Sequence, residues 1–399
     1  AGDAEADVPC DPNGEPLVVI GKTIADPFVG RVSLMKVCSG TLRPDTVLTN
    51  SRTRADERLH GLFTLRGKEH ETVTEVVAGD LVAVAKLSDS HTGDTLAPKG
   101  TPVRALLPEP PPPALWIAIK PKSQGDEDKL MTSLHRLQEE DPTLVVERNE
   151  ETHQSLLGGA GETHLAVISE RLTRKFGVEV ETEEVAVAYR ETISMPATAE
   201  GKHKKQSGGH GQFGVCTITV APLPHGEGFV FVDKIVGGAI PRQFIPAVEK
   251  GIQEAMARGG PLGHPVVDIE VTLTDGKYHA VDSSEMSFKM AGALALHEAM
   301  INAGPVLLEP LSCLKVTIPM SLQGDVMGDL NARRGRVQQT DTSGDGTKVT
   351  ITALAPTSEL RRYAIDLRSL TGGRGNFTVT HDHYDVAPPQ VLERLRSAG

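Results

Sequence analysis

The sequence predicts a multidomain α+β protein, and three observations support this. Residues 15–100 hold short Val/Leu/Ile runs broken by turn signals, a pattern typical of a small all-β unit. Four consecutive prolines within residues 107–113 then mark a stiff boundary. Residues 114–182 and 309–383 each predict the element order βαββαβ, and a third α+β segment lies between them.

Composition narrows the class of protein. The 399 residues suffice for two to four domains, and no apolar run is long enough to cross a bilayer, so we expect no membrane partner. The four cysteines lie far apart without metal-ligand spacing, which favours a reducing, cytoplasmic location over a disulfide framework or a zinc site. The formal net charge of −12 excludes a basic coat over the whole chain, so any RNA contact must be local.

The all-β unit follows a small acidic tail, residues 1–13. Its evenly spaced turn signals predict a closed β-barrel over residues 14–106, and residues 107–113 form a proline-rich linker. The tail lacks the basic and apolar regions of a signal peptide, and the chain does not start with Met. We therefore expect the chain to be the later part of a longer protein.

The two βαββαβ segments predict ferredoxin-like domains over residues 114–192 and 309–399. In the first, Leu130, Leu134 and Leu137 mark one face of a helix. In the second, strands are expected at 314–318, 336–340, 349–354 and 375–381, and helices at 324–331 and 358–370.

Residues 193–308 predict the third α+β domain. Strands are expected at 217–220, 229–232 and 266–273, and a helix at 244–257. Asp282 is the expected N-cap of a second helix, with Glu285 as its capping-box partner.

Cations crowd beside four glycines in residues 202–214 of this otherwise acidic chain. A loop with little side-chain bulk and many backbone N–H donors can approach a phosphate backbone closely. The alternative is an exposed hairpin whose lysines only aid solubility. The strand-to-helix loop at residues 277–285, with Tyr278 and His279, would share a function with this stretch only if the fold brings the two together.

Arginines make part of the last domain locally basic, which predicts RNA contacts or, alternatively, ordinary solvated helix faces. The candidates are Arg333, Arg334, Arg336, Arg361 and Arg362.

Several chemistries are not expected. Gly21-Lys22-Thr23 resembles the end of a phosphate-binding loop, but Pro16 stands where the motif needs glycine, and Asn-Lys-x-Asp is absent. His381 and His383 could share a strand face, yet no third ligand cluster is visible, so we predict no metal. No Ser/His/Asp or Cys/His set suggests catalytic residues.

Short segments, each weak alone, together resemble translational elongation factor G over nearly the whole chain. The segments are Asp26-Pro27-Phe28-Val29-Gly30, Ala78-Gly79-Asp80, Thr92-Gly93-Asp94-Thr95-Leu96, Ala188-Tyr189-Arg190-Glu191-Thr192-Ile193, Lys205-Gln206-Ser207-Gly208-Gly209, Gly238-Ala239-Ile240-Pro241, Val281-Asp282-Ser283-Ser284-Glu285, Met327-Gly328-Asp329-Leu330-Asn331 and Asp366-Leu367-Arg368-Ser369-Leu370-Thr371.

The resemblance implies domains two to five of the factor, the fourth being an α+β domain of ribosomal-protein type. The GTPase domain would be absent, and the chain would then bind neither GTP nor magnesium and need no cofactor. Whether the chain itself is an enzyme is left uncertain, whereas the full-length protein would be a GTPase. Implied partners are both ribosomal subunits, the tRNA–mRNA at the decoding site and the protein's own G domain, with the chain a monomer. The implied decoding-site tip comprises Lys204, Lys205, Gln206, Ser207, Gly208, Gly209, His210, Tyr278 and His279.

The chain also departs from the family. The departures are Ala160 and Thr163 in Gly159-Ala160-Gly161-Glu162-Thr163-His164-Leu165, His210 where Arg is usual, Ala280 where Asp is usual, and Leu360-Arg361-Arg362. They indicate a divergent copy, for which ribosome recycling or a stress role stays open beside translocation. Two further functions stay open as well: a ribosomal protection factor, and a non-catalytic RNA-binding module without a G domain. The near-intact tip motifs at 204–209 and 278–285 favour translocation over protection.

Overall fold

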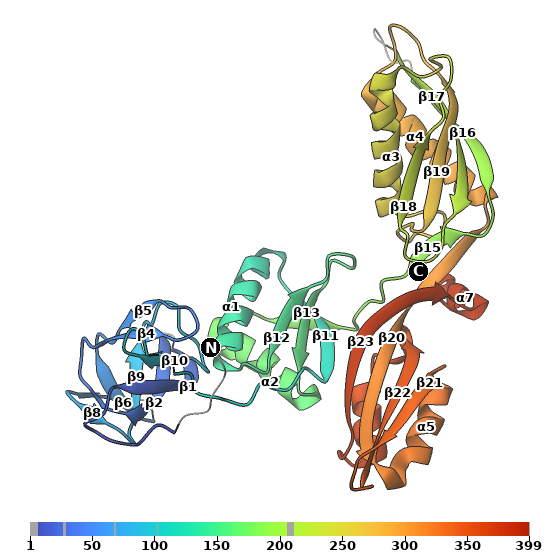
Figure 1. The fold of residues 1–399 in the computed structure, drawn as a ribbon. Coiled ribbons are helices and arrows are strands. Elements are labelled where there is room, and N and C mark those ends of the chain that lie inside the picture. The colour runs from blue at the N-terminus through green and yellow to red at the C-terminus, as the bar shows by residue number, and fades with distance from the viewer. Residues whose placement is uncertain (1–6, 27–28, 68, 102, 206–210, 399) are drawn as a thin grey trace. The chain divides into compact units, whose positions relative to one another are not determined.

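The computed structural model describes residues 7–26, 29–67, 69–101, 103–205 and 211–398. It divides into two compact units, residues 1–186 and 187–399, and each is described by itself (Figure 1). Among the described residues, no helix combines the length and apolar character that a membrane span requires.

The first part of the chain is the predicted β-barrel. An eight-stranded sheet has the order β5-β4-β10-β1-β2-β9-β6-β7, and β3 pairs separately with β8. Buried side chains from these strands form one apolar cluster, because alternate residues point inward from each curved strand. The strands are β1 (Leu17–Asp26), β2 (Gly30–Ser39), β3 (Thr41–Leu42), β4 (Val47–Asn50), β5 (Asp56–Arg58), β6 (Leu62–Arg66), β7 (Glu69–Val73), β8 (Val76–Val77), β9 (Leu81–Ala85) and β10 (Thr95–Ala97).

The next domain has the predicted ferredoxin-like order. Its antiparallel sheet runs β12-β13-β11-β14, so the first and third strands are central. The predicted helical face is confirmed, since Leu130, Leu134 and Leu137 are buried. The elements are β11 (Leu115–Pro121), α1 (Glu127–Glu140), β12 (Val145–Arg148), β13 (Ser155–Gly159), α2 (Glu162–Arg171) and β14 (Val180–Glu183).

The third α+β domain packs two helices against a four-stranded sheet of order β16-β17-β19-β18, in which only β18 and β19 run parallel. Glycines let α4 approach the sheet closely: a Cβ on Gly201 would lie 2.1 Å from the Ala291 carbonyl oxygen, and one on Gly214 would lie 2.9 Å from the backbone of Ser287. The elements are β15 (Arg190–Ile193), β16 (Ala197–Lys205), β17 (Gln212–Pro222), β18 (Phe229–Asp233), α3 (Ile245–Arg258), β19 (Ile269–Lys277) and α4 (Glu285–Asn302).

The predicted N-cap of α4 is wrong. Ser284, not Asp282, caps the helix, because the Ser284 hydroxyl accepts the Ser287 N–H at 3.2 Å. Asp282 is therefore available for contacts outside the helix.

The last domain repeats the ferredoxin-like order as β21-β22-β20-β23, and β15 pairs with the first residues of β20. Helices α5 and α6 contribute Val326, Leu330, Tyr363 and Leu367 to the core that covers one sheet face. The elements are β20 (Pro305–Pro319), α5 (Gln323–Ala332), β21 (Arg336–Thr342), β22 (Lys348–Pro356), α6 (Tyr363–Thr371), β23 (Asn376–Val386) and α7 (Pro389–Ala398).

Candidate nucleic-acid interface

The described parts of the two stretches singled out in the sequence, residues 202–205 and 211–214 of the first and 277–285 of the second, lie at one end of the β16–β17–β19 sheet (Figure 1). Strand register sets Lys204 opposite Phe213, and Val215 opposite Lys277. The end of β16, the start of β17 and the end of β19 therefore lie side by side. The condition for a shared function is met.

Hydrogen bonds join the second loop to the start of β17. The Phe213 N–H donates to the Asp282 carbonyl at 2.8 Å, and the Ser283 hydroxyl donates to the Phe213 carbonyl at 2.8 Å. The Gly211 N–H donates to Asp282 Oδ1 at 3.1 Å. These bonds hold Asp282 and Ser283 against Gly211 and Phe213.

His279 stands on this connected surface with its side chain 56% exposed. Its Nδ1 accepts the Asp282 N–H at 3.2 Å, and its ring meets the Phe213 ring edge-on at a centroid distance of 6.4 Å. The neighbouring Tyr278 is also exposed. An imidazole and a phenol held at a sheet end can stack on bases and hydrogen-bond to ribose.

Lysines lie on the strands at this end of the sheet. Lys204 and Lys205 are exposed at the end of β16, and their contact with phosphates stays a prediction. Lys202 and Lys277 are exposed as well. Both lie directly opposite Val215 of β17, Lys202 on β16 and Lys277 on β19. The other predicted tip residues, Gln206, Ser207, Gly208, Gly209 and His210, lie outside the described residues.

Several members of this surface lie inside the two stretches singled out in the sequence but were not among the predicted tip residues. Lys277 and Lys202 join it only through strand register, and Phe213, Asp282 and Ser283 join it through contacts between segments far apart in the chain. A prediction that β17 pairs with β19 would have identified these residues as neighbours.

The arginines of the last domain divide into two groups. Arg333 bonds to Asp329 at 2.9 Å and to Asp366 at 2.8 Å, and Arg334 bonds to both oxygens of Glu309. These hydrogen bonds to carboxylates are the largest cause of the raised pKa of each guanidinium. Both side chains thus stabilise the fold of the last domain.

Arg336, Arg361 and Arg362 form the second group and have exposed side chains. An exposed guanidinium can meet phosphates bidentately. Their contact with ribosomal RNA stays a prediction, as does that of the first group.

The two histidines considered as metal ligands, His381 and His383, lie on β23. No group of three or more His, Cys, Asp or Glu residues within the described ranges is placed to hold an ion. His383 Nδ1 lies 2.5 Å from the Asp382 carboxylate, and His381 packs its ring against Tyr384.

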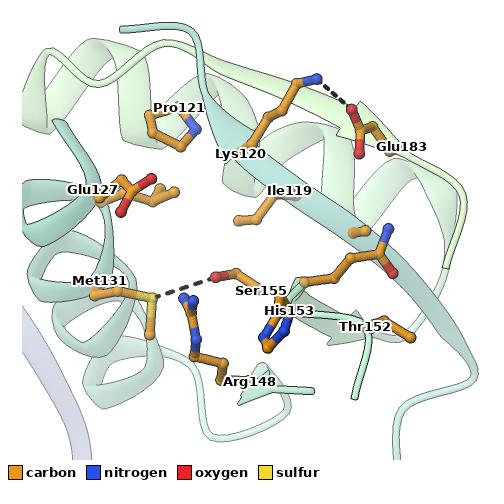
Figure 2. Close-up of a pocket in the computed structure, with 13 residues that line it drawn as sticks. Ile119, Lys120, Pro121, Glu127, Met131, Arg148, Thr152, His153, Ser155 and Glu183 are labelled. Carbon is orange, nitrogen blue, oxygen red and sulfur yellow. Dashed lines mark hydrogen bonds and ion pairs between the residues drawn. The ribbon is translucent and has the colours of Figure 1, made fainter. Parts of the chain in front are cut away.

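A cavity of about 380 Å³ lies in the first ferredoxin-like domain, between α1, β11 and β13 (Figure 2). Figure 2 shows Lys120 turned toward Glu183 and the Ser155 hydroxyl turned toward Met131. Its wall mixes Ile119 and other apolar side chains with charges of both signs, so it does not select one ligand chemistry.

Four family models match successive parts of the chain. They are elongation factor G domain 2 over residues 16–99, elongation factor G domain III over 110–184, elongation factor G domain IV over 185–304 and the elongation factor G C-terminus over 306–395.

Similar proteins agree with this domain series. Two relatives described as elongation factor G-like protein, from two strains of Mycobacterium tuberculosis, are 47% identical over 412 residues and cover 99% of the chain. A crystal structure of a Thermus thermophilus protein matches 97% of the chain with a TM-score of 0.82 and 39% identity. The chain spans 58% of the length of each of these proteins.

Proposed function

The chain belongs to the elongation factor G family, and on that premise we propose that it is the ribosome-binding part of an elongation-factor-G-like translation factor. The observation that carries the proposal is the meeting of two segments at one sheet end, where Lys204 pairs with Phe213 and the Phe213 ring meets the ring of His279. In this proposal that end enters the decoding site of the small subunit and supports movement of the tRNA–mRNA.

In this proposal the lysines, His279 and the aromatic rings make different kinds of contact with RNA. Lysines neutralise phosphates and supply affinity without reading sequence. His279 adds a directed hydrogen-bond donor, and the aromatic rings add stacking. Nucleotide chemistry would belong to a G domain outside this chain, which would bind GTP and magnesium and drive the motion.

Salt-dependent binding tests the proposal. Binding of the 399-residue chain to ribosomes is measured across a salt series for wild type and for Lys204→Ala/Lys205→Ala. If both lysines meet phosphates, each loss lowers the slope of log affinity against log salt by roughly one. Lys250→Ala, an exposed change on α3 in the same domain, is the matched control and should keep the wild-type slope. Absence of ribosome binding, or an unchanged slope in the double variant, would overturn the proposal.

The full-length protein distinguishes the step of translation. A translocase moves tRNA–mRNA in a rapid-kinetic assay, whereas a recycling factor splits post-termination ribosomes into subunits. We expect the movement assay to respond. Subunit splitting without movement would assign the protein to recycling instead.

A further inference from the structure

Asp282 joins the two loops of the candidate interface through both its backbone and its side chain. We propose that Asp282 is a positioning residue that holds His279 and the start of β17 in one fixed arrangement. The functional half of this inference rests on the ribosome-binding function proposed above.

The side chain of Asp282 has one oxygen for each loop. Its Oδ1 accepts the Gly211 N–H at 3.1 Å, and its Oδ2 lies 3.3 Å from His279 Nδ1. A Cβ on Gly211 would lie 3.0 Å from the Asp282 carboxyl carbon, so the absence of a side chain at position 211 permits the close approach. One carboxylate therefore couples two segments 71 residues apart.

The backbone of Asp282 reinforces the same geometry. Its carbonyl accepts the Phe213 N–H at 2.8 Å, and its N–H donates to His279 Nδ1 at 3.2 Å. The next residue, Ser283, receives the His279 N–H on its hydroxyl at 2.8 Å. The position of the His279 ring is thus set by groups at residues 282 and 283.

This arrangement determines which ring nitrogen is the outward donor. In the neutral imidazole, Nδ1 accepts the Asp282 N–H, so the ring hydrogen is on Nε2. In the protonated ring, Nδ1–H can donate to the Asp282 carboxylate, and Nε2 keeps its hydrogen. His279 consequently offers an Nε2–H donor in both states, suited to an acceptor such as a phosphate, a ribose 2′-oxygen or a base carbonyl of RNA.

Asp282 can serve both loops because it does not cap α4. Ser284 has that role, and its hydroxyl accepts the Ser287 N–H. Loss of the Asp282 carboxylate should therefore loosen the loops without removing the cap of the helix.

Amide exchange tests the positioning directly, without ribosomes. Hydrogen exchange of the Gly211, Phe213 and His279 amides is measured by NMR on the 399-residue chain. Asp282→Ala should speed exchange of all three amides by about tenfold. Asp282→Asn keeps an oxygen for Gly211 and should exchange as wild type does. The control Asp233→Ala removes only a local bond to the Ile235 N–H and should leave the three amides unchanged. Unchanged exchange in Asp282→Ala would overturn the inference.

A double-mutant cycle on ribosome affinity tests whether Asp282 acts through His279. We expect Asp282→Ala to weaken binding about tenfold in the wild-type chain but less than about twofold in the His279→Ala chain, because coupled residues are non-additive. Asp282→Asn should restore most of the affinity. A full effect of Asp282→Ala in the His279→Ala chain would overturn the positioning role. If wild type does not bind ribosomes at all, the proposed function fails, and the exchange result alone decides the inference.

Discussion

The Arg334 guanidinium forms a two-pronged pair with the Glu309 carboxylate, with Nη1–Oε1 at 2.7 Å and Nη2–Oε2 at 2.9 Å. Glu309 is only 4% exposed on β20, and Arg334 follows α5 with a left-handed backbone at φ 58°. The pair ties the end of a helix to the central strand of its sheet. An arginine held in this way stabilises the domain whether or not it meets RNA.

The first prediction concerns the removal of this pair. Arg334→Met would leave the Glu309 carboxylate buried without its partner and should destabilise the last domain by about 2–3 kcal/mol, below the full value for a buried pair because Arg334 is partly exposed. Arg362→Met, an exposed change nearby, should stay within about 0.5 kcal/mol. Peptide-resolved hydrogen exchange of β20 and α6 measures both. An Arg334→Met protein with normal exchange but weaker ribosome binding would assign the residue to RNA contact.

The second prediction concerns acid stability of the barrel. Asp94 is 6% exposed, and its carboxylate receives two 2.7 Å bonds from Arg52 and one from the His91 N–H. Burial acts to raise the pKa of Asp94, but these hydrogen bonds outweigh it and lower the pKa. The stabilisation is therefore complete above the unfolded-state pKa of about 4 and is lost as the pH falls toward the folded-state pKa.

Asp94→Asn should consequently destabilise the barrel by about 1–3 kcal/mol at pH 7. The difference from wild type should shrink below about pH 4, where wild type also loses the charge. Hydrogen exchange of β1 and β10 peptides at a series of pH values provides the measurement. A difference that grows on acidification would contradict the assigned direction of the pKa shift.

The third prediction concerns Glu191, which is fully buried on β15. Its carboxylate accepts the Leu262 N–H at 2.9 Å and the His264 N–H at 3.1 Å. Glu191→Ala would leave both donors unsatisfied and open a cavity, so we expect a loss of about 2–4 kcal/mol. Denaturant unfolding, with hydrogen exchange of residues 259–266 as the readout, measures this loss of stability. Glu200→Ala, an exposed change on β16, is the control. Equal stability of the two variants would contradict the prediction.

The pH dependence of this effect has the opposite sign to that of Asp94. Burial raises the pKa of Glu191. Its contribution is therefore fully present below the unfolded-state pKa of about 4.3 and declines as the pH rises through the folded-state value. The destabilisation by Glu191→Ala should be largest at acid pH.

Hydrophobic periodicity correctly located those helices and strands whose pattern is set by neighbouring residues in the sequence. The spacing of Leu130, Leu134 and Leu137 located α1, because a helix places such residues on one face. The strand expected at 314–318 was too short. β20 in fact runs through Pro310, which lies between the residues paired with β15 and those paired with β22. A missing N–H is tolerated there.

The candidate interface was only partly predictable, because long-range contacts select among locally equivalent residues. Asp282, Ser283 and Ser284 could each cap α4 by residue type. The contacts of Asp282 with Gly211 and of Ser283 with Phe213 leave Ser284 as the cap. Lys277 joined the surface through strand register, which composition does not encode.

The fourth prediction concerns His279 itself. His279→Ala removes an exposed side chain, so the free energy of unfolding should change by no more than about 0.5 kcal/mol. In the full-length protein we expect GTP hydrolysis to continue at the wild-type rate, because the residue carries no nucleotide chemistry. The mechanical step should slow roughly tenfold, the kinetic value of one directed hydrogen bond in the transition state.

Rapid-kinetic assays of hydrolysis and of tRNA–mRNA movement, performed on the same full-length variant, measure the two steps separately. His225→Ala is the matched control, since His225 is an exposed histidine in the turn after β17, at the opposite end of the same sheet. His279→Gln should recover part of the rate, because its amide can still donate. Equal slowing of hydrolysis and movement, or no effect on either, would mean that His279 does not act at the working end of this protein.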